Sequence, residues 1–560
     1  MQEENWLRWV FYIFQLISGL FSEMIQIGAA SMSITRRTAM KLIAATAPAL
    51  ALGRSLHQQE DLEIQKGPFV GTWESLQQYQ VPEWFRDAKF GIWAHWGPQS
   101  GVEQGDWYAR LMYIQGTRQY NYHVAHFGHP SKVGFKDLCP KWKADEFDPD
   151  YLMALYKRAG ARYFVSMGVH HDNFDLWNSK HTRWNAVKVG PHRDIVGLWR
   201  RAALRQGLRF GVSEHLWISY KWFAVSHGSD KTGPFAGIPY DGVDPANTDL
   251  YHDVGCAKWA REGDPAHPYD TEFDWNSEGV PDSWKHHWFL RIRDLVDNYL
   301  PDLLYTDGGL PFENYGSSVV ANLYNHSAKV HSGQVQAVYT SKEPADCARG
   351  TCVLDIERGV ADQLRPVPWQ TDTCIGEWHY YIDLYEKHQY KSPKKLIDML
   401  VDIVSQNGNL LLNFPLPNSG QPDPDELKIL AAITDWMQVN GQAIHGTRPW
   451  KIYGEGPSTR IAKPGAEFNE DERKPLTAED VRFTTKGNAL YAFIMDWPEK
   501  ETLIPALGTA SPQKPGKIGN VELLGSKGGI KWTQEAMGLR MLFPPEKPCS
   551  FAVTLKVSFG

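Results

Sequence analysis

The feature that most constrains the fold is a repeated order of amphipathic helix and short apolar strand along most of the chain. The helices are predicted at 147–161, 194–206, 285–299, 396–405 and 425–440, and the strands at 89–96, 163–171, 208–215, 303–306, 336–340, 351–356 and 409–415. Seven or eight strands alternating with helices predict an α/β fold, a TIM-type (β/α) barrel. A doubly wound open sheet competes with it, but no Gly-x-Gly-x-x-Gly motif follows any of these strands.

After residues 448–450 the pattern changes to short strands without intervening helices. These strands are predicted at 481–485, 489–496, 520–524, 530–533, 539–543 and 551–557. Their spacing is typical of a β-sandwich. We therefore predict an N-terminal extension with an export signal at 1–60, the barrel at 61–448 and the β-sandwich at 449–560. The stretch 226–282, rich in Gly, Pro, Asp and Asn, is predicted to be an elaborated loop over one barrel face.

The N-terminal residues have the pattern of a targeting signal rather than of a folded domain. The pair Arg36-Arg37 precedes a modest apolar run at 42–52, which resembles a twin-arginine export signal and predicts a periplasmic or secreted protein. Another apolar run, 9–21, lies upstream of the arginines, so we expect translation to start at Met32 or Met24; a short membrane anchor is the alternative. No later segment approaches the roughly 20 apolar residues of a membrane-spanning helix.

Charge, cysteine spacing and tryptophan content limit the kinds of ligand or partner that the chain can be expected to bind. With 58 Lys+Arg against 65 Asp+Glu the net charge is −7, and no long basic run favours a nucleic-acid partner. The six cysteines contain no C-x-x-C pair, so neither a zinc module nor a disulfide scaffold is indicated, and Cys347 with Cys352 is the pair most compatible with a disulfide. The 23 tryptophans fit either a chain that stacks sugar rings or an aromatic core.

Polar side chains follow the predicted barrel strands. The run 303–309 ends on Asp307 and two glycines, and a carboxylate at the C-terminal end of a barrel strand lies at the open mouth where such enzymes do their chemistry. The other strand ends and the first loop carry further polar and aromatic side chains: His95, His170, His171, Glu214, His215, Glu357, Asp106 and Trp107. We expect all of them to converge on one rim.

These histidines suit either a metal or a neutral sugar. A metal site in a barrel usually takes ligands two apart on one strand, whereas His170 and His171 are adjacent and the alternation of a strand would point them to opposite faces. Imidazoles can donate to and accept from hydroxyl groups, and Trp96, Trp107 and Trp177 offer apolar faces for a sugar ring. We therefore expect a sugar ligand, with no metal and no cofactor.

Hydrolysis of a glycoside requires two carboxyl groups, one beside the anomeric carbon and one to protonate the leaving oxygen. Asp307 is the first. The candidates for the second are Glu214, Glu313, Asp355, Glu357 and Glu377. Barrel order favours Glu357, just past its strand, although a structural salt bridge from Glu357 to Arg358 or Arg349 is the alternative.

An ordered series of motifs then matches one family. The matching stretches are 88–97, 105–108, 159–163, 170–177, 182–185, 305–308 and 440–450. Together they resemble glycoside hydrolase family 29, the retaining α-L-fucosidases, from about residue 73 to 450, with the β-sandwich as the usual C-terminal domain of that family.

The resemblance implies a nucleophile at Asp307 and fucose contacts at His95, Trp107, His170 and His171; we complete the expected substrate-binding set with Trp96, Asp106, His215 and Trp378. Asp106 stands where the family commonly has Glu, and His215 stands near a usual tyrosine contact.

The resulting hypothesis is an exported exo-α-L-fucosidase that cleaves terminal fucose from oligosaccharides or glycoconjugates with retention, using Glu357 as acid/base and no cofactor. An exo-glycosidase for a related sugar such as galactose, or a sugar-binding protein with a degenerate catalytic pair, are the alternatives. The sequence leaves the oligomeric state open.

Overall fold

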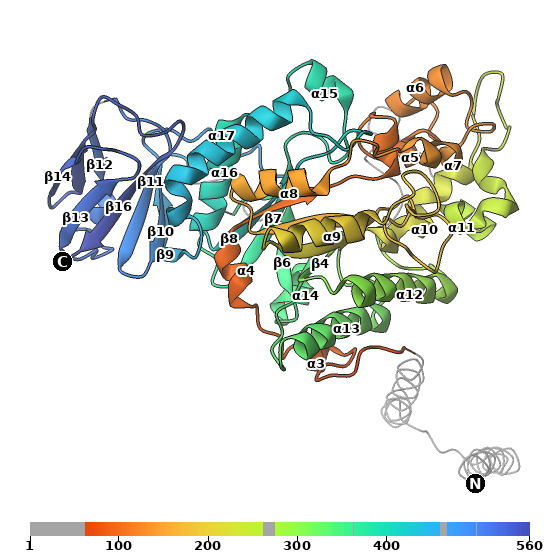
Figure 1. Cartoon of the computed structure of the whole chain (residues 1–560), viewed down its shortest axis with the longest axis horizontal. Coiled ribbons are helices and arrows are strands. Elements are labelled where there is room, and N and C mark those ends of the chain that lie inside the picture. The colour runs from red at the N-terminus through yellow and green to blue at the C-terminus, as the bar shows by residue number, and fades with distance from the viewer. Residues whose placement is uncertain (1–61, 261–274, 362, 460–466, 500) are drawn as a thin grey trace, which may run out of the picture. The chain divides into compact units, whose positions relative to one another are not determined.

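The computed structural model describes residues 62–260, 275–361, 363–459, 467–499 and 501–560 (Figure 1). The expected export signal, the apolar run before it and the expected start codons all lie outside the described residues. From Ile64 to Gly560 the chain forms one compact unit.

Eight parallel strands close into a barrel in chain order, and the last strand pairs with the first. The strands are β1 (Phe90–Ala94), β2 (Tyr163–Val169), β3 (Arg209–Glu214), β4 (Leu303–Thr306), β5 (Val338–Ser341), β6 (Val353–Glu357), β7 (Trp369–Cys374) and β8 (Gly408–Asn413). The predicted TIM-type barrel is confirmed. The sequence pattern missed β7, whose residues Trp-Gln-Thr-Asp-Thr-Cys are mostly polar although every one of them is buried.

Five predicted helices are confirmed within a few residues, and two further helices of similar length, α6 and α13, were not predicted. The longer helices are α6 (Arg118–His126), α8 (Pro149–Arg158), α9 (Ile195–Arg205), α12 (Asp282–Tyr299), α13 (Asn314–Val330), α16 (Pro393–Ser405) and α17 (Pro424–Asn440). The shorter ones are α3 (Trp73–Leu76), α4 (Glu83–Ala88), α5 (Tyr108–Leu111), α7 (Phe135–Leu138), α10 (Ser219–Trp222), α11 (Thr248–Tyr251), α14 (Pro344–Ala348) and α15 (Ile382–Glu386). Side chains such as Asp148 and Asp423 begin their helices by accepting hydrogen bonds from free backbone amides, as expected of N-caps.

The barrel interior is filled by large side chains below the carboxyl ends of the strands. Trp93, Tyr163, Val165, Leu303 and Tyr305 belong to one buried cluster. The rings of Trp93 and Tyr305 lie 4.8 Å apart between centroids. Because both residues stand one or two positions before a strand-end polar side chain, they form an apolar floor beneath the rim.

The C-terminal part consists of two antiparallel sheets. One has the order β13-β16-β11-β10-β9 and the other β12-β15-β14. The strands are β9 (Arg448–Glu455), β10 (Val481–Lys486), β11 (Ala489–Ile494), β12 (Glu501–Ile504), β13 (Ile518–Leu523), β14 (Lys531–Gln534), β15 (Leu539–Leu542) and β16 (Val553–Phe559). Phe483 and Leu490 of one sheet share a buried core with Leu539 and Met541 of the other. This is the predicted sandwich; the exact domain limits at 60 and 448 stay predictions.

Cys347 and Cys352 form a disulfide, as their spacing suggested. The other four cysteines, Cys139, Cys256, Cys374 and Cys549, carry free thiols. Among the helices of the described residues, none has both the length and the hydropathy that crossing a membrane would require.

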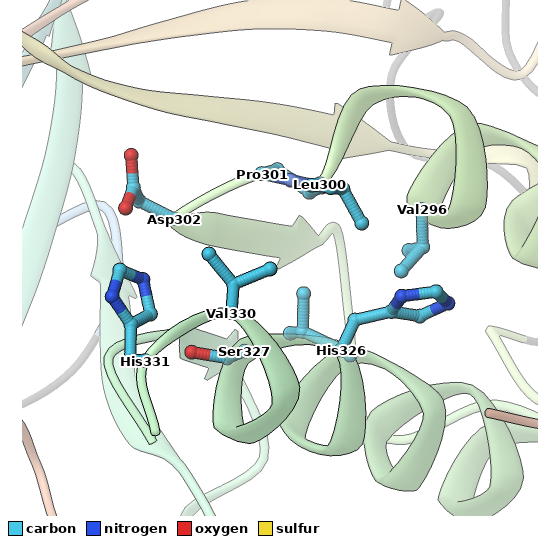
Figure 2. Close-up of a pocket in the computed structure, with 9 residues that line it drawn as sticks. Val296, Leu300, Pro301, Asp302, His326, Ser327, Val330 and His331 are labelled. Carbon is cyan, nitrogen blue, oxygen red and sulfur yellow. The ribbon is translucent and has the colours of Figure 1, made fainter. Parts of the chain in front are cut away.

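A small hollow lies between α12 and α13, where Figure 2 shows Val296 and Leu300 facing Val330. Pro301 and Asp302, which also line it, come directly before β4. The hollow is therefore at the opposite end of β4 from Asp307, and it is separate from the rim described next.

Candidate active site

Asp307 follows β4 and lies at the centre of the rim. One of its carboxylate oxygens, Oδ2, is 3.0 Å from His215 Nδ1 and 3.4 Å from His171 Nε2, and the other, Oδ1, is 2.6 Å from Lys342 Nζ. Its side chain is 19% exposed, so a ligand can still reach it. The expected convergence of Asp307 with His171 and His215 is present in the structure.

Steric crowding explains why the residue after Asp307 is a glycine. Gly308 has φ +136°, and a Cβ atom there would lie 2.7 Å from the ring of Trp217. The indole of Trp217 in turn donates a hydrogen bond of 2.5 Å to the backbone carbonyl of Asp307. Gly308 therefore lets Trp217 pack close enough to hold the backbone of Asp307 in place.

Lys342 is a site residue that the sequence prediction missed. It follows β5, and its ammonium group contacts both Asp307 and Glu357, with Asp372 4.0 Å away. Its position just past a barrel strand could have indicated it, since the other site residues also follow strand ends. The strand was predicted to end at 340, however, and Lys342 was not considered.

Glu357 is the second carboxylate at this cation. It ends β6, and Trp378 Nε1 donates to its Oε1 at 3.2 Å. The alternative reading of Glu357, a salt bridge to Arg358 or Arg349, is not what the structure has. The guanidinium of Arg358 lies over the ring of Trp378 at 5.3 Å and that of Arg349 over the ring of Trp73 at 4.4 Å.

Three other carboxyl candidates are engaged elsewhere. Glu214 accepts hydrogen bonds from the amide of Leu216 and the indole of Trp288, 3.0 and 3.1 Å long. Glu377 accepts from the amide of Asp106, and Asp355 accepts from the side chain of Gln370. Glu357 is therefore the candidate that reaches the same ammonium group as Asp307.

The surroundings of the two carboxylates shift their pKa values in opposite directions. Burial by itself would raise the pKa of Asp307, but the Lys342 cation and His215 outweigh it and hold that pKa well below its usual range. Burial raises the pKa of Glu357 to about 7, with Asp372 and Asp307 adding to the rise and Lys342 opposing it. Near neutral pH, Asp307 is ionised while Glu357 is partly protonated, the pattern of a nucleophile paired with an acid.

Buried histidines line the rest of the rim. The ring centroid of His95 is 5.2 Å from that of His170, 4.8 Å from His215 and 4.9 Å from His379. Burial, which is the largest cause, lowers the pKa of His95 and His170 well below the usual value and that of His215 to about 4. His95 Nδ1, His215 Nε2 and His379 Nε2 have no hydrogen-bond partner among the described residues, so they are available to ligand hydroxyl groups.

The argument that placed His170 and His171 on opposite faces is wrong. β2 ends at Val169, so both residues lie beyond the strand and its alternation does not apply. Their rings lie 4.3 Å apart and both belong to the rim. Two groups, His95/His170/His215 and His171/His215/Asp307, bring three ligand atoms within 4.8 Å of one another, which is also compatible with a metal ion. The expectation of a metal-free site stays a prediction.

The first loop and the loop after β7 meet at Asp106. Its carboxylate accepts from the backbone amides of Trp378 and His379, at 2.9 and 2.6 Å. Asp106 therefore orients the loop that carries these two rings. Trp378 lies 5.5 Å from His95, and Trp107, with φ +55°, lies 6.1 Å from His171. His379 was not predicted, although its neighbours Glu377 and Trp378 were named.

Trp96 is part of another cluster. Its ring packs 5.0 Å from that of Trp142 and 4.9 Å from that of Phe147, and its indole donates to the carbonyl of Pro417. Trp177 donates to the buried carboxylate of Asp294. Both side chains are buried structural residues, and neither is retained in the proposed sugar site.

Comparison with known proteins agrees with this geometry. Residues 56–442 match the family model described as alpha-L-fucosidase, and residues 473–558 match that of the alpha-L-fucosidase C-terminal domain. The chain belongs to the alpha-L-fucosidase family. As a member of this family, the protein is a glycoside hydrolase.

Named relatives of the same family extend over nearly the whole chain. Tissue alpha-L-fucosidase of Mus musculus is 27% identical over 503 residues, covering 88% of this chain and 94% of that protein. Tissue alpha-L-fucosidase of Homo sapiens is 26% identical over 503 residues, covering 88% and 92%. The crystal structure of Thermotoga maritima alpha-fucosidase in complex with fucose has a TM-score of 0.63 at 24% identity and covers 87% of this chain and 100% of that one. That structural likeness supports the fold.

Proposed function

We propose that the protein is an exo-acting α-L-fucosidase that removes terminal α-L-fucose from oligosaccharides or glycoconjugates with retention of configuration. Asp307 is the nucleophile and Glu357 the acid/base. The observation that carries the proposal is the shared contact of both carboxylates with the Lys342 ammonium group.

The shared cation limits the distance between the two carboxylates. Oxygens that both contact one nitrogen lie no more than about 6 Å apart, since each contact spans about 3 Å. Retaining glycosidases separate their carboxyl groups by about 5–5.5 Å, whereas inverting enzymes need about 6.5–9.5 Å to admit a water molecule. The short separation favours double displacement.

In the first step Asp307 attacks C1 of fucose while Glu357 donates its proton to the departing oxygen. In the second step the ionised Glu357 takes a proton from water, which attacks C1 and frees Asp307. Lys342 contributes to both steps, because its charge keeps Asp307 ionised and stabilises Glu357 after it has lost its proton. Apart from the substrate and the attacking water, these steps use only side chains of this chain.

The histidines and tryptophans of the rim hold the sugar itself. His95, His170, His171 and His215 offer ring nitrogens to the hydroxyl groups, and Trp107 with Trp378 offers apolar faces to the ring. A related sugar such as galactose differs at the C6 substituent, so a screen of aryl glycosides tests the preference.

The nucleophile is tested with Asp307→Ala and an aryl α-L-fucoside. Hydrolysis should fall by many orders of magnitude, and activity within a few-fold of wild type would contradict the assignment.

Product NMR at early times should show the α anomer released first, as retention requires. Glu357→Ala should keep activity on substrates with activated leaving groups and recover further with azide, giving a fucosyl azide of α configuration, because azide takes the place of water in the second displacement.

We propose in addition that Arg36-Arg37 and the apolar run 42–52 direct export to the periplasm or beyond, a proposal that rests on sequence alone. N-terminal sequencing of the exported protein tests it. A mature chain that still contains Trp9 would contradict it.

A further inference from the structure

A segment outside both family matches lies against the end of the strand that carries Glu357. Between β9 and β10, the amide of Phe468 donates to the carbonyl of Glu357 at 2.8 Å, and the amide of Glu470 donates to the carbonyl of Arg358 at 2.9 Å. The matched ranges stop at 442 and resume at 473. A connection between two strands of the sandwich thus reaches the active-site rim.

The segment is firmly anchored there. The side chain of Asn469 accepts from the amide of Val360 at 2.7 Å. Glu470, only 6% exposed, accepts from Lys391 and from Thr373, each at 2.6 Å. These contacts order the backbone before any ligand arrives, so binding a sugar here would cost little further ordering.

Two side chains of this anchored segment are left for a ligand. Phe468 is 62% exposed although its backbone is held, and its φ of +55° is uncommon for an aromatic residue. Glu467 is exposed too, and it directly precedes Phe468 in this anchored segment. An exposed aromatic side chain and an exposed carboxylate, adjacent in the chain, therefore belong to the segment whose backbone is bonded to Glu357.

We propose that Glu467 and Phe468 form the leaving-group subsite and bind the pyranose ring to which the fucose is linked. This inference rests on the proposed role of Glu357, because the oxygen that Glu357 protonates is the one that joins the two sugars. The ring beyond that oxygen must lie on the Glu357 side of the rim, where the segment lies. The face of Phe468 packs on the C–H face of the ring, and the carboxylate of Glu467 accepts from its hydroxyl groups.

The competing role is purely structural: the segment would only support the end of β6. Asn469 and Glu470 already do this through buried contacts, and the exposed ring of Phe468 is not needed for it. The two roles differ in one respect. A support acts on every substrate alike, whereas a leaving-group subsite acts only on substrates whose leaving group has a ring.

The test compares α-L-fucosyl fluoride, whose leaving group has no ring, with a panel of α-L-fucosyl disaccharides of different linkage. Phe468→Ala should lower kcat/KM by about threefold to tenfold on at least one disaccharide, the size expected for loss of one aromatic contact, and leave the fluoride within about twofold. Phe468→Trp should restore the disaccharide, and Glu467→Gln should lower the same disaccharides. Met537→Ala, at a residue of the sandwich that is 73% exposed, is the matched control and should change neither substrate.

An equal loss on fluoride and disaccharides in Phe468→Ala would overturn the proposal in favour of a support, and no loss on any disaccharide would also overturn it. A different variant, Glu357→Ala, tests the proposed function independently of the subsite. Fluoride leaves without a proton from the enzyme, so Glu357→Ala should lose kcat/KM on the disaccharides and keep much of kcat/KM on the fluoride, which reports the first step, while its kcat falls because the second step still lacks its base. If Glu357→Ala kept the disaccharides, the acid assignment would be wrong whatever Phe468 does.

Discussion

Lys342 Nζ lies 2.6 Å from Asp307 Oδ1, and this contact couples the charge of the nucleophile to that of its partner. The same ammonium group contacts Glu357, and both carboxylates raise the pKa of Lys342 well above its usual value despite its burial. One permanent cation thus serves two acids with opposite requirements. Asp307 must stay ionised, whereas Glu357 must gain and lose a proton in each cycle.

Lys342→Met should therefore move both limbs of the pH profile in the same direction. Without the cation the pKa of Asp307 rises, so the acid limb shifts to higher pH, and the pKa of Glu357 rises above about 7, so the alkaline limb shifts up as well. We expect kcat/KM at the optimum to fall by about 100-fold, typical of losing one charged stabilising group. Lys342→Arg keeps the charge and should shift the limbs less; a loss without any shift would contradict the coupling.

The second prediction concerns the alkaline limb of the pH profile and follows from the pKa of Glu357, which is about 7. Since the acid form is needed for a sugar leaving group, kcat/KM on disaccharides should decline as pH rises through about 7. In Glu357→Gln, which has no ionising group there, that alkaline limb should vanish along with most of the activity. Wild-type hydrolysis of α-L-fucosyl fluoride needs no proton and should lack the limb; an unchanged limb on the fluoride would assign it to another group.

Strand-end residues could be predicted because the barrel forces them together. Asp307, His95 and His215 each follow a recognisable apolar run, so the pattern alone indicated that they meet. β7 could not be recognised, because its polar side chains are satisfied by neighbouring strands: Gln370 donates to Asp355 and Thr371 donates to the carbonyl of Ile356.

The remaining site residues depend on contacts with no local signature. His379 has no motif of its own and was passed over although the adjacent Trp378 was named, and Lys342 stands two residues past the predicted end of its strand. The segment at Phe468 pairs with Glu357 across more than a hundred residues of chain, and nothing in the intervening pattern indicates such a return. Trp96 was misplaced because an aromatic residue beside a strand-end histidine can equally well pack outward.

A buried charge network joins the barrel to the sandwich and gives a stability prediction. Asp402 of α16 pairs with Arg482 of β10 at 2.6 Å and with Arg473 at 2.9 Å, and these side chains are 7% exposed or less. Asp402→Ala leaves two buried guanidinium groups without their partner and should destabilise the protein by about 3–5 kcal/mol. Thermal unfolding should show a lower midpoint, whereas Arg205→Ala, which removes an exposed pair with Asp150, should barely move it. An unchanged midpoint in Asp402→Ala would mean that the network does not stabilise the fold.

Chelation distinguishes a sugar rim from a metal rim. The nitrogens of His95, His170 and His215 lie within 4.8 Å of one another, so the imidazoles can meet either hydroxyl groups or a metal ion. The two-carboxylate mechanism uses no ion, and dialysis against EDTA should leave kcat and KM on an aryl fucoside unchanged. Added Zn²⁺ should raise KM without lowering kcat, because the ion and the sugar compete for the same neutral nitrogens. A loss of activity on chelation that Zn²⁺ restores would contradict the metal-free mechanism and give the histidines a ligand role in catalysis.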